Sequence, residues 1–478
     1  MDNRPPARHT LVMRHLLLAL FFALPALAPA QPAARPPNVV LILVDDLGQT
    51  DLGVYGSKLY ETPNIDRLAA QGVRFTSAYS ACTVCSPTRA ALLTGKYPAR
   101  LRITDWIAGH KRPNAPLLPP DWQQHLPPAE VTLAEALKAA GYATAHVGKW
   151  HLGDEAYFPD KHGFDVNLGG YNRGQPPSYF APYKIPTLAE GPAGEYLTDR
   201  EVDEACKFID ANRARPFFIN LWHYAVHTPL QGKKEVIAKY AAKANDTPQK
   251  GKPAYAALIE SVDDALGKIM AKLAELKLEE QTIIVFTSDN GGLIGATGAN
   301  LGARAGKGSA YEGGVRVPLI VKFPGLTKPG ATCAEPTITP DLYPTLLALA
   351  RTPGDAAHNA AVDGASLVPL LADPAAKLAR DAIYWHYPHY HPGGATPYSA
   401  VRARDWRLIE FYETGKAELY NLATDPEEKN DLADSNPDKA KELRAMLHAW
   451  RKSVAAQDPV KNPDAKPAPA PRGAGKAK

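Results

Sequence analysis

Cysteine is scarce in this sequence, and its distribution limits the chemistry that it can support. Four cysteines occur in 478 residues, and only Cys82 and Cys85 lie close together. Their C-x-x-C spacing is compatible with a redox pair or with half of a zinc site. A second C-x-x-C is absent, and Cys206 and Cys333 are isolated in the sequence, so a closed structural zinc site lacks ligands. A redox protein that uses Cys82 and Cys85 stays open as an alternative.

The sequence also lacks a strong charge of either sign. The formal net charge is +4, but residues 461–478 contribute +4 and residues 1–30 contribute +2, which leaves −2 for residues 31–460. A body with this balance offers no basic face of the kind that nucleic acid requires, so no nucleic-acid partner is expected. Internal repeats are not visible either, and 478 residues are enough for two domains.

Long apolar runs are lacking except at the N-terminus. Arg14 and His15 lead into the apolar residues 16–28, which are followed by the small-residue site Ala28-Pro29-Ala30. This order is typical of a signal peptide, so we expect residues 1–30 to direct export to the periplasm or the extracellular space. The run is too short and too interrupted for a membrane span, and stable membrane insertion is not expected.

Short apolar runs and helical patterns alternate along most of the chain. The first run, from Asn38 to Val44, is typical of a strand that is buried on both faces. Further strands are predicted at 144–147, 216–221, 282–287 and 318–322, and helices at 63–71, 132–140, 197–213 and 254–276. This alternation predicts an α/β fold with a large, mainly parallel sheet flanked by helices, in which ligands gather at the carboxyl ends of the strands.

The pattern changes after about residue 375. Short strands are predicted at 382–386, 398–401, 406–411 and 418–421, followed by a helix from residue 438 to about residue 456. We therefore expect a catalytic domain at 35–375 and a smaller C-terminal α+β domain at 376–460. Residues 461–478 are rich in Ala, Pro, Gly and Lys and are expected to be disordered.

Cys85 lies at the expected start of a short apolar helix. Pro87 follows closely, and proline is favoured at the first helical position because its ring presets φ and it has no N–H to satisfy. The N-terminus of a helix favours an anion, and Arg89 projects to the same side one turn later. The sequence therefore predicts an oxyanion site around Cys85.

Oxygen ligands follow two of the predicted strands. Asp45 and Asp46 end the first strand, and Asp289 and Asn290 follow the strand at 282–287. These side chains suit Ca²⁺ or Mg²⁺ and offer zinc neither imidazole nor thiolate. Either pair alone is also compatible with a solvated strand end, but together with Cys85 they predict a metal site.

Cations and imidazoles occur in three further loops. Lys149 and His151 follow the strand at 144–147, His227 follows the strand at 216–221, and Lys307 lies in the glycine-rich stretch 306–314. A pocket that combines them with Arg89 and a divalent cation carries more positive charge than a neutral substrate needs. It suits a tetrahedral anionic ester whose transition state places charge on equatorial oxygens.

With these motifs in place, the chain resembles the type I sulfatases of the alkaline phosphatase superfamily. The signature is Cys85-x-Pro87-x-Arg89 with Leu92, Thr94 and Gly95, and the other motifs follow in the family's order. The stretch 418–427 resembles the family's C-terminal domain, so the resemblance covers nearly the whole mature chain. It implies an alkaline phosphatase-like fold and a sulfuric ester hydrolase.

The resemblance also implies a role for each matching residue. A maturation enzyme would oxidise Cys85 to formylglycine, and the hydrate of this residue would be the nucleophile. Ca²⁺, preferred over Mg²⁺, would be bound by Asp45, Asp46, Asp289, Asn290 and an oxygen of modified Cys85. Arg89 would hold the modified residue, His151 would remove the proton that releases sulfate, and the sulfate itself would be bound by Lys149, Lys307 and His227.

The family acts on sulfate esters of sugars, steroids and aryl alcohols, and export favours a sulfated glycan. The stretch 384–394 is dense in aromatic and imidazole side chains, which suit a sugar ring, although a strand packed between domains has the same composition. It resembles bacterial sulfatases that act on polysaccharides, some with galactose-type 4-sulfates, so a galactose-type sugar is the candidate. The expected substrate-binding residues are His386, His389, Asp105, His110 and Arg173, with Trp106 and Asn172 beside them.

Two other functions are compatible with parts of this pattern. One is a phosphonate or phosphate ester hydrolase of the same superfamily that uses the same modified cysteine. The other is a non-catalytic glycan-binding protein on a degenerate scaffold. Every catalytic position of the motif is filled in this sequence, which argues against the second.

Overall fold

The computed structural model describes residues 1–4, 35–247, 249, 251–294 and 302–466. The chain divides into two compact units, residues 1–35 and residues 36–478. Within the first unit, residues 1–4 are exposed and have no regular secondary structure. The predicted signal peptide, residues 1–30, lies outside the described residues except for these four, so it stays a prediction.

An eight-stranded sheet, ordered β10-β2-β9-β8-β1-β7-β5-β6, lies at the centre of the second unit. β1 (Asn38–Val44) lies between β7 (Phe217–Trp222) and β8 (Thr282–Ser288) and is parallel to both. The parallel part continues through β5 (Ala143–Gly148) and β6 (Val166–Leu168). β9 (Leu319–Lys322) runs antiparallel to β8 and to β2 (Val73–Phe75), which pairs with β10 (Ala331–Cys333). The predicted mainly parallel, mixed sheet is confirmed.

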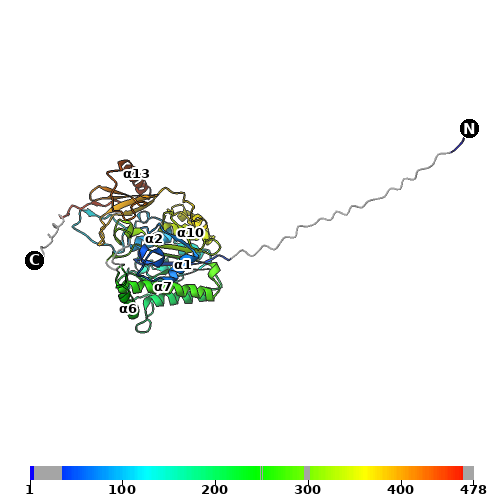
Figure 1. Cartoon of the computed structure of the whole chain (residues 1–478), viewed down its shortest axis with the longest axis horizontal. Helices are drawn as coiled ribbons and strands as arrows, with labels where there is room; N and C mark the ends of the chain where they lie inside the picture. The colour runs from blue at the N-terminus through cyan, green and yellow to red at the C-terminus, as the bar shows by residue number, and fades with distance from the viewer. Residues whose placement is uncertain (5–34, 248, 250, 295–301, 467–478) are drawn as a thin grey trace. The chain divides into compact units, whose positions relative to one another are not determined.

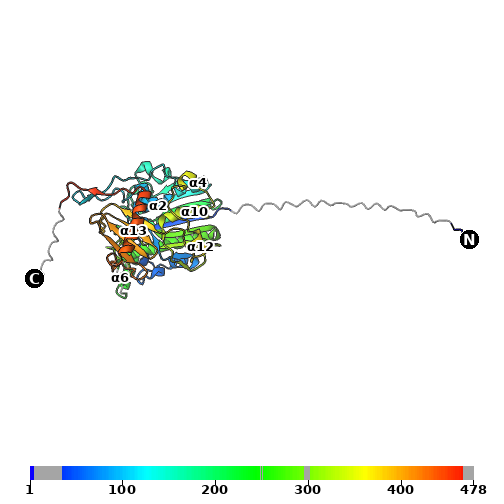
Figure 2. The ribbon, with the colours of Figure 1, turned by 90° about the horizontal axis from the view of Figure 1, so that it is seen from above.

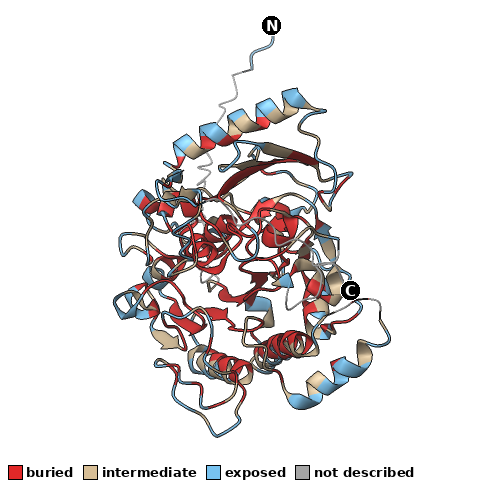
Figure 3. Ribbon diagram, turned by 90° about the vertical axis from the view of Figure 1, so that its left-hand side faces the viewer, coloured by how far each residue is buried: buried red, intermediate tan, exposed pale blue. Residues whose placement is uncertain are grey.

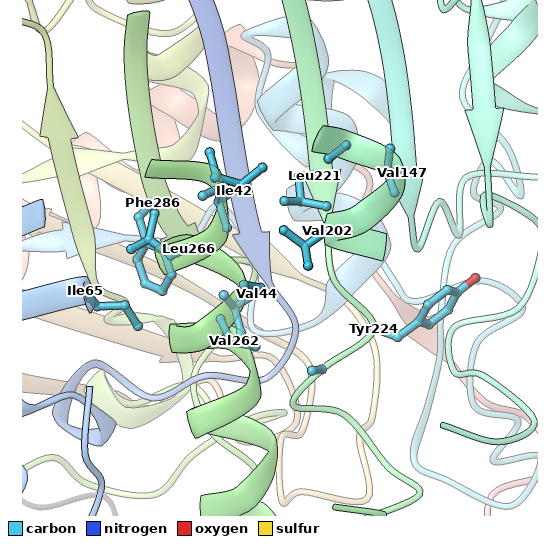
Figure 4. Close-up of a cluster of buried hydrophobic side chains, with 14 of the residues drawn as sticks. Ile42, Val44, Ile65, Val147, Val202, Leu221, Tyr224, Val262, Leu266 and Phe286 are labelled. Carbon is cyan, nitrogen blue, oxygen red and sulfur yellow. The ribbon is translucent and has the colours of Figure 1, made fainter. Parts of the chain in front are cut away.

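Alternate side chains of β1 enter two separate hydrophobic cores. Val40, Ile42 and Val44 belong to one core, and their neighbours in the strand belong to the other. The first core is covered by α1 (Pro63–Gln71), α5 (Leu197–Asn212) and α7 (Pro253–Glu275). Figure 1 labels α1 and α7, and Figure 4 shows core side chains from all three helices. The second is covered by α2 (Cys85–Thr94), α4 (Leu133–Ala139) and α10 (Leu342–Leu349), which Figure 2 labels. β1 is therefore buried on both faces, which explains its unbroken apolar sequence.

Local signals explain why the predicted helices begin where they do. Pro63 opens α1, where its missing N–H costs no hydrogen bond. At α4, the Thr132 hydroxyl accepts a hydrogen bond from the Glu135 N–H at 3.1 Å, and the Glu135 carboxylate accepts one from the Thr132 N–H at 2.7 Å. This reciprocal cap satisfies two N–H groups that have no partner within the helix.

A second, antiparallel sheet follows in the C-terminal part. It consists of β12 (Ile383–Tyr387), β13 (Tyr398–Ala403), β14 (Trp406–Phe411) and β15 (Ala417–Asn421). α13 (Pro437–Ser453) packs on it through Leu443, Leu447 and Trp450. Figure 3 shows the buried strands of the molecule inside and exposed residues on the outer helices. Both sheets belong to one compact unit, so the domain boundary at about residue 375 stays a prediction.

The remaining β-strands and α-helices are short, apart from α6. They are β3 (Ala78–Tyr79), α3 (Pro98–Leu101), β4 (Leu117–Leu118), α6 (Lys234–Lys243), α9 (Glu312–Val315), β11 (Thr337–Ile338), α11 (Ala356–Asn359), α12 (Val368–Ala372) and β16 (Val460–Lys461). Within the described ranges, no helix combines the length and the apolar character needed to cross a membrane.

Residues 461–466, which belong to the predicted disordered tail, make defined contacts with the rest of the chain. β16 pairs with β4, and Asn462 donates hydrogen bonds from its side-chain amide to the carbonyls of Pro113 and Ala115. These contacts hold residues 460–466 against a distant loop, which composition could not reveal. Residues 467–478 lie outside the described residues.

Candidate active site

Cys85 is the first residue of α2, so Pro87 occupies the third helical position rather than the predicted first one. Proline is tolerated there because the first N–H groups of a helix have no partner within it. The Cys85 side chain is buried in the wall of a cavity, and burial raises the pKa of its thiol. All four cysteines are free thiols, so the disulfide that a Cys82–Cys85 redox pair requires is not formed here.

The buried guanidinium of Arg89 connects α2 to the ends of two strands. Its Nε and Nη2 atoms lie 2.9 and 2.8 Å from Oδ2 of Asp289, which follows β8. Its Nη1 atom donates to the Lys149 carbonyl, directly after β5, at 2.8 Å. The Cζ atom of Arg89 lies 5.1 Å from the centroid of the Trp222 ring. Arg89 therefore fixes the nucleophile helix against the carboxyl edge of the sheet.

The predicted cations meet the predicted carboxylates at this edge. Lys149 Nζ lies 2.5 Å from Asp45 Oδ2. Lys307 Nζ lies 2.6 Å from Asp46 Oδ1 and 3.6 Å from Cys85 Sγ. The structure thus brings together side chains from four distant segments. Asp45 and Lys149 meet because the carboxyl ends of the parallel strands β1 and β5 open on the same side of the sheet.

Burial and charge set the protonation states of these groups. Burial, followed by the neighbouring Asp289, raises the pKa of Asp45 to about 8. Burial also acts on Asp46, but Lys307 and His227 outweigh it and hold the pKa of that carboxyl below its usual value. Burial and Lys149 keep the pKa of His151 well below its ordinary range, and burial and Lys307 lower that of His227 to about 3. Both imidazoles are therefore neutral at pH 7 and able to accept a proton.

The oxygen side chains fit a divalent cation. Three buried oxygens of this cluster have no hydrogen-bond partner among the described residues: Oδ1 of Asp45, Oδ2 of Asp46 and Oδ1 of Asn290. Candidate ligand atoms of Asp45, Asp46, Cys85 and His227 lie within 4.8 Å of one another. Asp289 is already engaged, by the Asp46 N–H at 3.3 Å and by Arg89. Unpaired buried oxygens are costly, and a hard cation such as Ca²⁺ would satisfy them.

A cavity of about 490 Å³ opens above this cluster. Its base is formed by Asp46, Cys85, His151, His227 and Lys307. The rest of the wall consists of Trp106, Ile107, Asn172, Arg173, Gly174, Gln175, Leu293, His391 and Pro392. Its volume lies in the range of roughly 300–1,000 Å³ that is typical of small-molecule sites, so it has room for more than a sulfate group.

Two glycines let imidazole rings approach the site. A Cβ atom on Gly308 would lie 1.7 Å from Nδ1 of His391, and Gly308 also has a φ of +72°. A Cβ atom on Gly174 would lie 2.5 Å from Cε1 of His151. Side chains at these two positions would displace the rings, so the glycine-rich stretch after Lys307 has a packing role.

The expected substrate-binding residues are only partly found at the cavity. Arg173, Trp106 and Asn172 line it, whereas Asp105, His110, His386 and His389 do not. His386 bonds to Ser399 Oγ at 2.8 Å and to the Gln457 carbonyl at 2.9 Å.

The other three residues that the cavity leaves out lie in its surroundings. His389 bonds to Thr104 Oγ1 at 2.8 Å, and the buried Asp105 accepts a hydrogen bond from the Tyr387 hydroxyl at 2.7 Å. His110 is exposed. His386, His389 and Asp105 are thus buried and hydrogen-bonded within the protein, and their direct contact with substrate stays a prediction.

Sequence reasoning missed His391, Gln175 and Leu293 as cavity residues. His391 belongs to the aromatic and imidazole-rich stretch that the sequence singled out. The signal did not identify the correct histidine, because β12 ends at Tyr387 and the loop beyond it has no regular alternation of faces. Gln175 and Leu293 carry no sequence signal at all.

Comparisons with known proteins agree with this site. The family model for sulfatases matches residues 37–352, and the one for the C-terminal part of N-sulphoglucosamine sulphohydrolase matches residues 306–457. A sulfatase of Formosa agariphila is 33% identical over a gapped alignment of 506 positions. The alignment covers 89% of this chain and 91% of that protein. The N-acetylgalactosamine-6-sulfatase of Rattus norvegicus is 38% identical over 390 residues, with coverages of 75% and 70%.

Solved structures give the same result. The crystal structure of Ps i-CgsB in complex with k-i-k-neocarrahexaose is 31% identical, with a TM-score of 0.76 and coverages of 88% of this chain and 94% of that chain. The phosphonate monoester hydrolase of Agrobacterium radiobacter is 20% identical, with a TM-score of 0.63 and coverages of 89% and 99%. At this identity, the second likeness shows a common fold alone.

The fold and the site define a hydrolase of the alkaline phosphatase superfamily, with helices on both faces of a mixed sheet. More narrowly, the chain belongs to the sulfatase family and is a sulfuric ester hydrolase.

Proposed function

We propose that this protein removes sulfate from a sulfated glycan outside the cytoplasm, with formylglycine derived from Cys85 as nucleophile and Ca²⁺ as cofactor. One observation carries the proposal: Cys85 begins α2 in the wall of the cavity, 3.6 Å from Lys307 and beside buried oxygens that have no hydrogen-bond partner among the described residues. Conversion of Cys85 would require a maturation enzyme as partner. The apolar N-terminal segment supports export.

The chain's own residues divide the work of hydrolysis. Lys149, Lys307 and His227 bind the sulfate oxygens and stabilise the charge that develops on them. Arg89 orients residue 85, and the neutral His151, whose Nδ1 has no hydrogen-bond partner among the described residues, accepts the proton that releases sulfate. Formylglycine supplies a hydrated aldehyde with two hydroxyl groups, and Ca²⁺ supplies positive charge that favours ionisation of an oxygen nucleophile.

The substrate class is supported by the relatives and by the cavity. Relatives named for N-acetylgalactosamine 6-sulfate and a neighbour solved with a carbohydrate favour a sugar over an aryl alcohol. The same relatives support a galactose-type sugar as the first candidate. An aromatic ring, two side-chain amides and an imidazole in the cavity wall suit sugar hydroxyls and sugar ring faces.

Kinetics on matched esters test this function. Matured protein should release sulfate from p-nitrophenyl sulfate and from sulfated saccharides much faster than it releases phosphate from p-nitrophenyl phosphate. The leaving group is constant in the aryl pair, so the ratio reports the group that is transferred. A higher rate on the phosphate or a phosphonate ester would overturn the sulfatase assignment in favour of the alternative hydrolase, and no hydrolysis of any ester would favour a binding protein.

Replacing His151 with alanine should stop turnover after substrate has reacted. We expect kcat to fall by roughly 10²- to 10⁴-fold, the usual contribution of a proton-transferring side chain. Sulfate should then remain on the protein and appear as a mass increase in intact-mass spectra. The His448→Ala variant, changed on the distant helix α13, should keep normal turnover. Normal turnover in His151→Ala would remove this residue from the reaction.

Calcium should stabilise the folded protein, and Asn290→Ala should weaken this effect. A ligand at a hundred-fold excess over its dissociation constant stabilises the native state by about 2.7 kcal/mol. We therefore expect Ca²⁺ to raise the Tm of chelator-treated protein more than Mg²⁺ does. Asn290→Ala removes one oxygen ligand without changing the net charge and should raise the dissociation constant about ten-fold or more.

Asn220 provides the matched control for the calcium experiment. It is also buried, in β7, and its Oδ1 also lacks a hydrogen-bond partner within the described ranges. Asn220→Ala should lower the Tm but leave the shift caused by Ca²⁺ unchanged. Equal calcium responses in the two variants would contradict the assignment of Asn290, and an equal response to Mg²⁺ would contradict the preference for calcium.

A further inference from the structure

Arg173 is the outermost cation in the wall of the cavity. It lies in the loop after β6, and its side chain is exposed. Within the described part of the chain, Arg173 takes part in no ion pair, whereas the basic side chains of the site are paired with carboxylates: Lys149 with Asp45, Lys307 with Asp46, and Arg89 with Asp289. Its charge is therefore available to a group that comes from solution.

The surroundings of Arg173 favour an anion attached to a sugar. Described cavity residues outside the base include no carboxylate, so nothing in this wall repels a negative group. Asn172 and Gln175 add amide groups on the same loop, and the wall also contains His391 and the ring of Trp106. Amides and imidazole hydrogen-bond to sugar hydroxyls, and an aromatic ring packs on a sugar face.

The reacting sulfate does not need Arg173. Lys307 and His227 already lie at the base with residue 85, and Lys149 is buried against Asp45. Among the described residues, Arg173 forms no hydrogen bond or ion pair with any of these three side chains. A guanidinium presents a planar pair of donors that matches the two oxygens of a sulfate or a carboxylate. The geometry therefore provides two places for anionic groups within one cavity of about 490 Å³.

We propose that Arg173 binds a second anionic group of the substrate, so that the preferred substrate is a glycan with a further sulfate or carboxylate near the ester that is hydrolysed. This inference rests on the proposed sulfatase activity. It goes beyond that activity because a site for a single sulfate ester accepts neutral and charged sugars alike. It also identifies Arg173 as a residue that selects among sulfated sugars.

Three saccharide probes test the inference. They are N-acetylgalactosamine 6-sulfate, N-acetylgalactosamine 4,6-disulfate, and the 6-sulfate linked to a uronic acid. For the unchanged protein, kcat/KM should be at least about ten-fold higher on one of the two doubly charged probes than on the singly charged one, as one charge-assisted hydrogen bond predicts. A preference for the disulfate would identify a second sulfate as the partner of Arg173. A preference for the uronic acid probe would identify a carboxylate.

In the Arg173→Gln variant, the ratio of kcat/KM on the preferred doubly charged probe to kcat/KM on the singly charged probe should fall to about one. Arg173→Lys should retain part of the preference. Because the readout is a ratio between two substrates of the same protein, a general loss of activity does not imitate it. Arg67→Gln, which changes an exposed arginine on α1, should leave the ratio unchanged. The preference should also shrink as the salt concentration rises, because the group is exposed.

Failure of this inference is distinguishable from failure of the proposed function. Sulfate release from p-nitrophenyl sulfate without a preference for either doubly charged probe would overturn the role of Arg173 and leave the sulfatase intact. A preference that persists in Arg173→Gln would overturn it too. No release from any sulfate ester would overturn the proposed function, and the inference with it.

Discussion

Replacing Cys85 with alanine should lower the rate of sulfate release at least about a thousand-fold, while the fold stays intact. The variant removes the side chain that we propose as the source of formylglycine, and the loss of a nucleophile has effects of this size. Alanine fits the position, because residue 85 begins a helix and buries only a small side chain there. Sulfate release is measured on matured protein, and folding by the Tm.

Protein made without the maturation enzyme should be equally inactive. Burial raises the pKa of the Cys85 thiol, so the unmodified residue is not ionised at neutral pH and is a poor nucleophile. Cys82→Ala is the matched control, since Cys82 is also buried and lies three residues earlier but outside the cavity lining. It should keep most of the activity. Full activity in protein whose residue 85 is shown by peptide mass to be cysteine would contradict the proposed nucleophile.

Replacing Arg407 with methionine should cost about 3–5 kcal/mol of folding free energy, the usual cost of breaking a buried ion pair. Arg407 lies in β14 and is fully buried. Its Nη1 atom lies 2.7 Å from Glu312 and 3.2 Å from Glu428, and its Nη2 atom donates to the Ala310 carbonyl at 2.6 Å. The variant removes the cation that two buried carboxylates share, and leaves Glu312 with only the longer ion pair to Arg316 at 3.8 Å.

This loss should depend on pH. Burial, opposed by Arg407, raises the pKa of Glu428 to about 7 and also raises that of Glu312. A carboxyl whose pKa is raised on folding holds its proton more tightly in the native state, so stability is lost as pH rises through the folded pKa. Without Arg407 both pKa values rise further. The free energy of unfolding that Arg407→Met loses relative to the unchanged protein should therefore be larger at pH 8 than at pH 5, as measured by urea unfolding.

Activity should also fall in Arg407→Met, because Ala310 lies in the loop after Lys307 and Glu312 begins α9 at the end of this loop. Arg444→Met on α13 is the control: its partner Glu410 lies 3.3 Å away at the surface, and such a pair contributes about 0–1 kcal/mol. Equal losses of stability in the two variants would contradict the role of the buried network. A loss of stability and activity in Arg407→Met but not in Arg444→Met would show that the C-terminal sheet supports the active-site loop.

The sequence predicted the long elements of the fold well, for a physical reason. β1, α1 and β14 have the bounds that their patterns indicated, since a fully buried strand or an amphipathic helix repeats its signal over many residues. β6 and β10 span three residues each and were not predicted. Three residues carry too little periodicity to be recognised. β6 forms by pairing with the longer β5, and β10 by pairing at the sheet edge with β2, which is equally short.

The same difference separates the base of the site from its wall. Residues such as Asp45, Lys149 and Asp289 follow long strands directly, so the sequence alone placed them at one edge of the sheet. His386 and His391 lie five positions apart in one stretch, yet only His391 reaches the cavity. Which of them does so depends on where β12 ends and on the absence of a side chain at Gly308.

The sequence by itself thus determined the chemistry of this protein, because strand ends and a helix start are local features that motifs record. Only the tertiary structure decided what surrounds that chemistry. Loops that are far apart in the chain form the wall of the cavity, and their side chains are oriented by long-range contacts that no local pattern encodes. Arg173 was a candidate from the sequence, but its position at the cavity, outside every ion pair of the described residues, came from the fold.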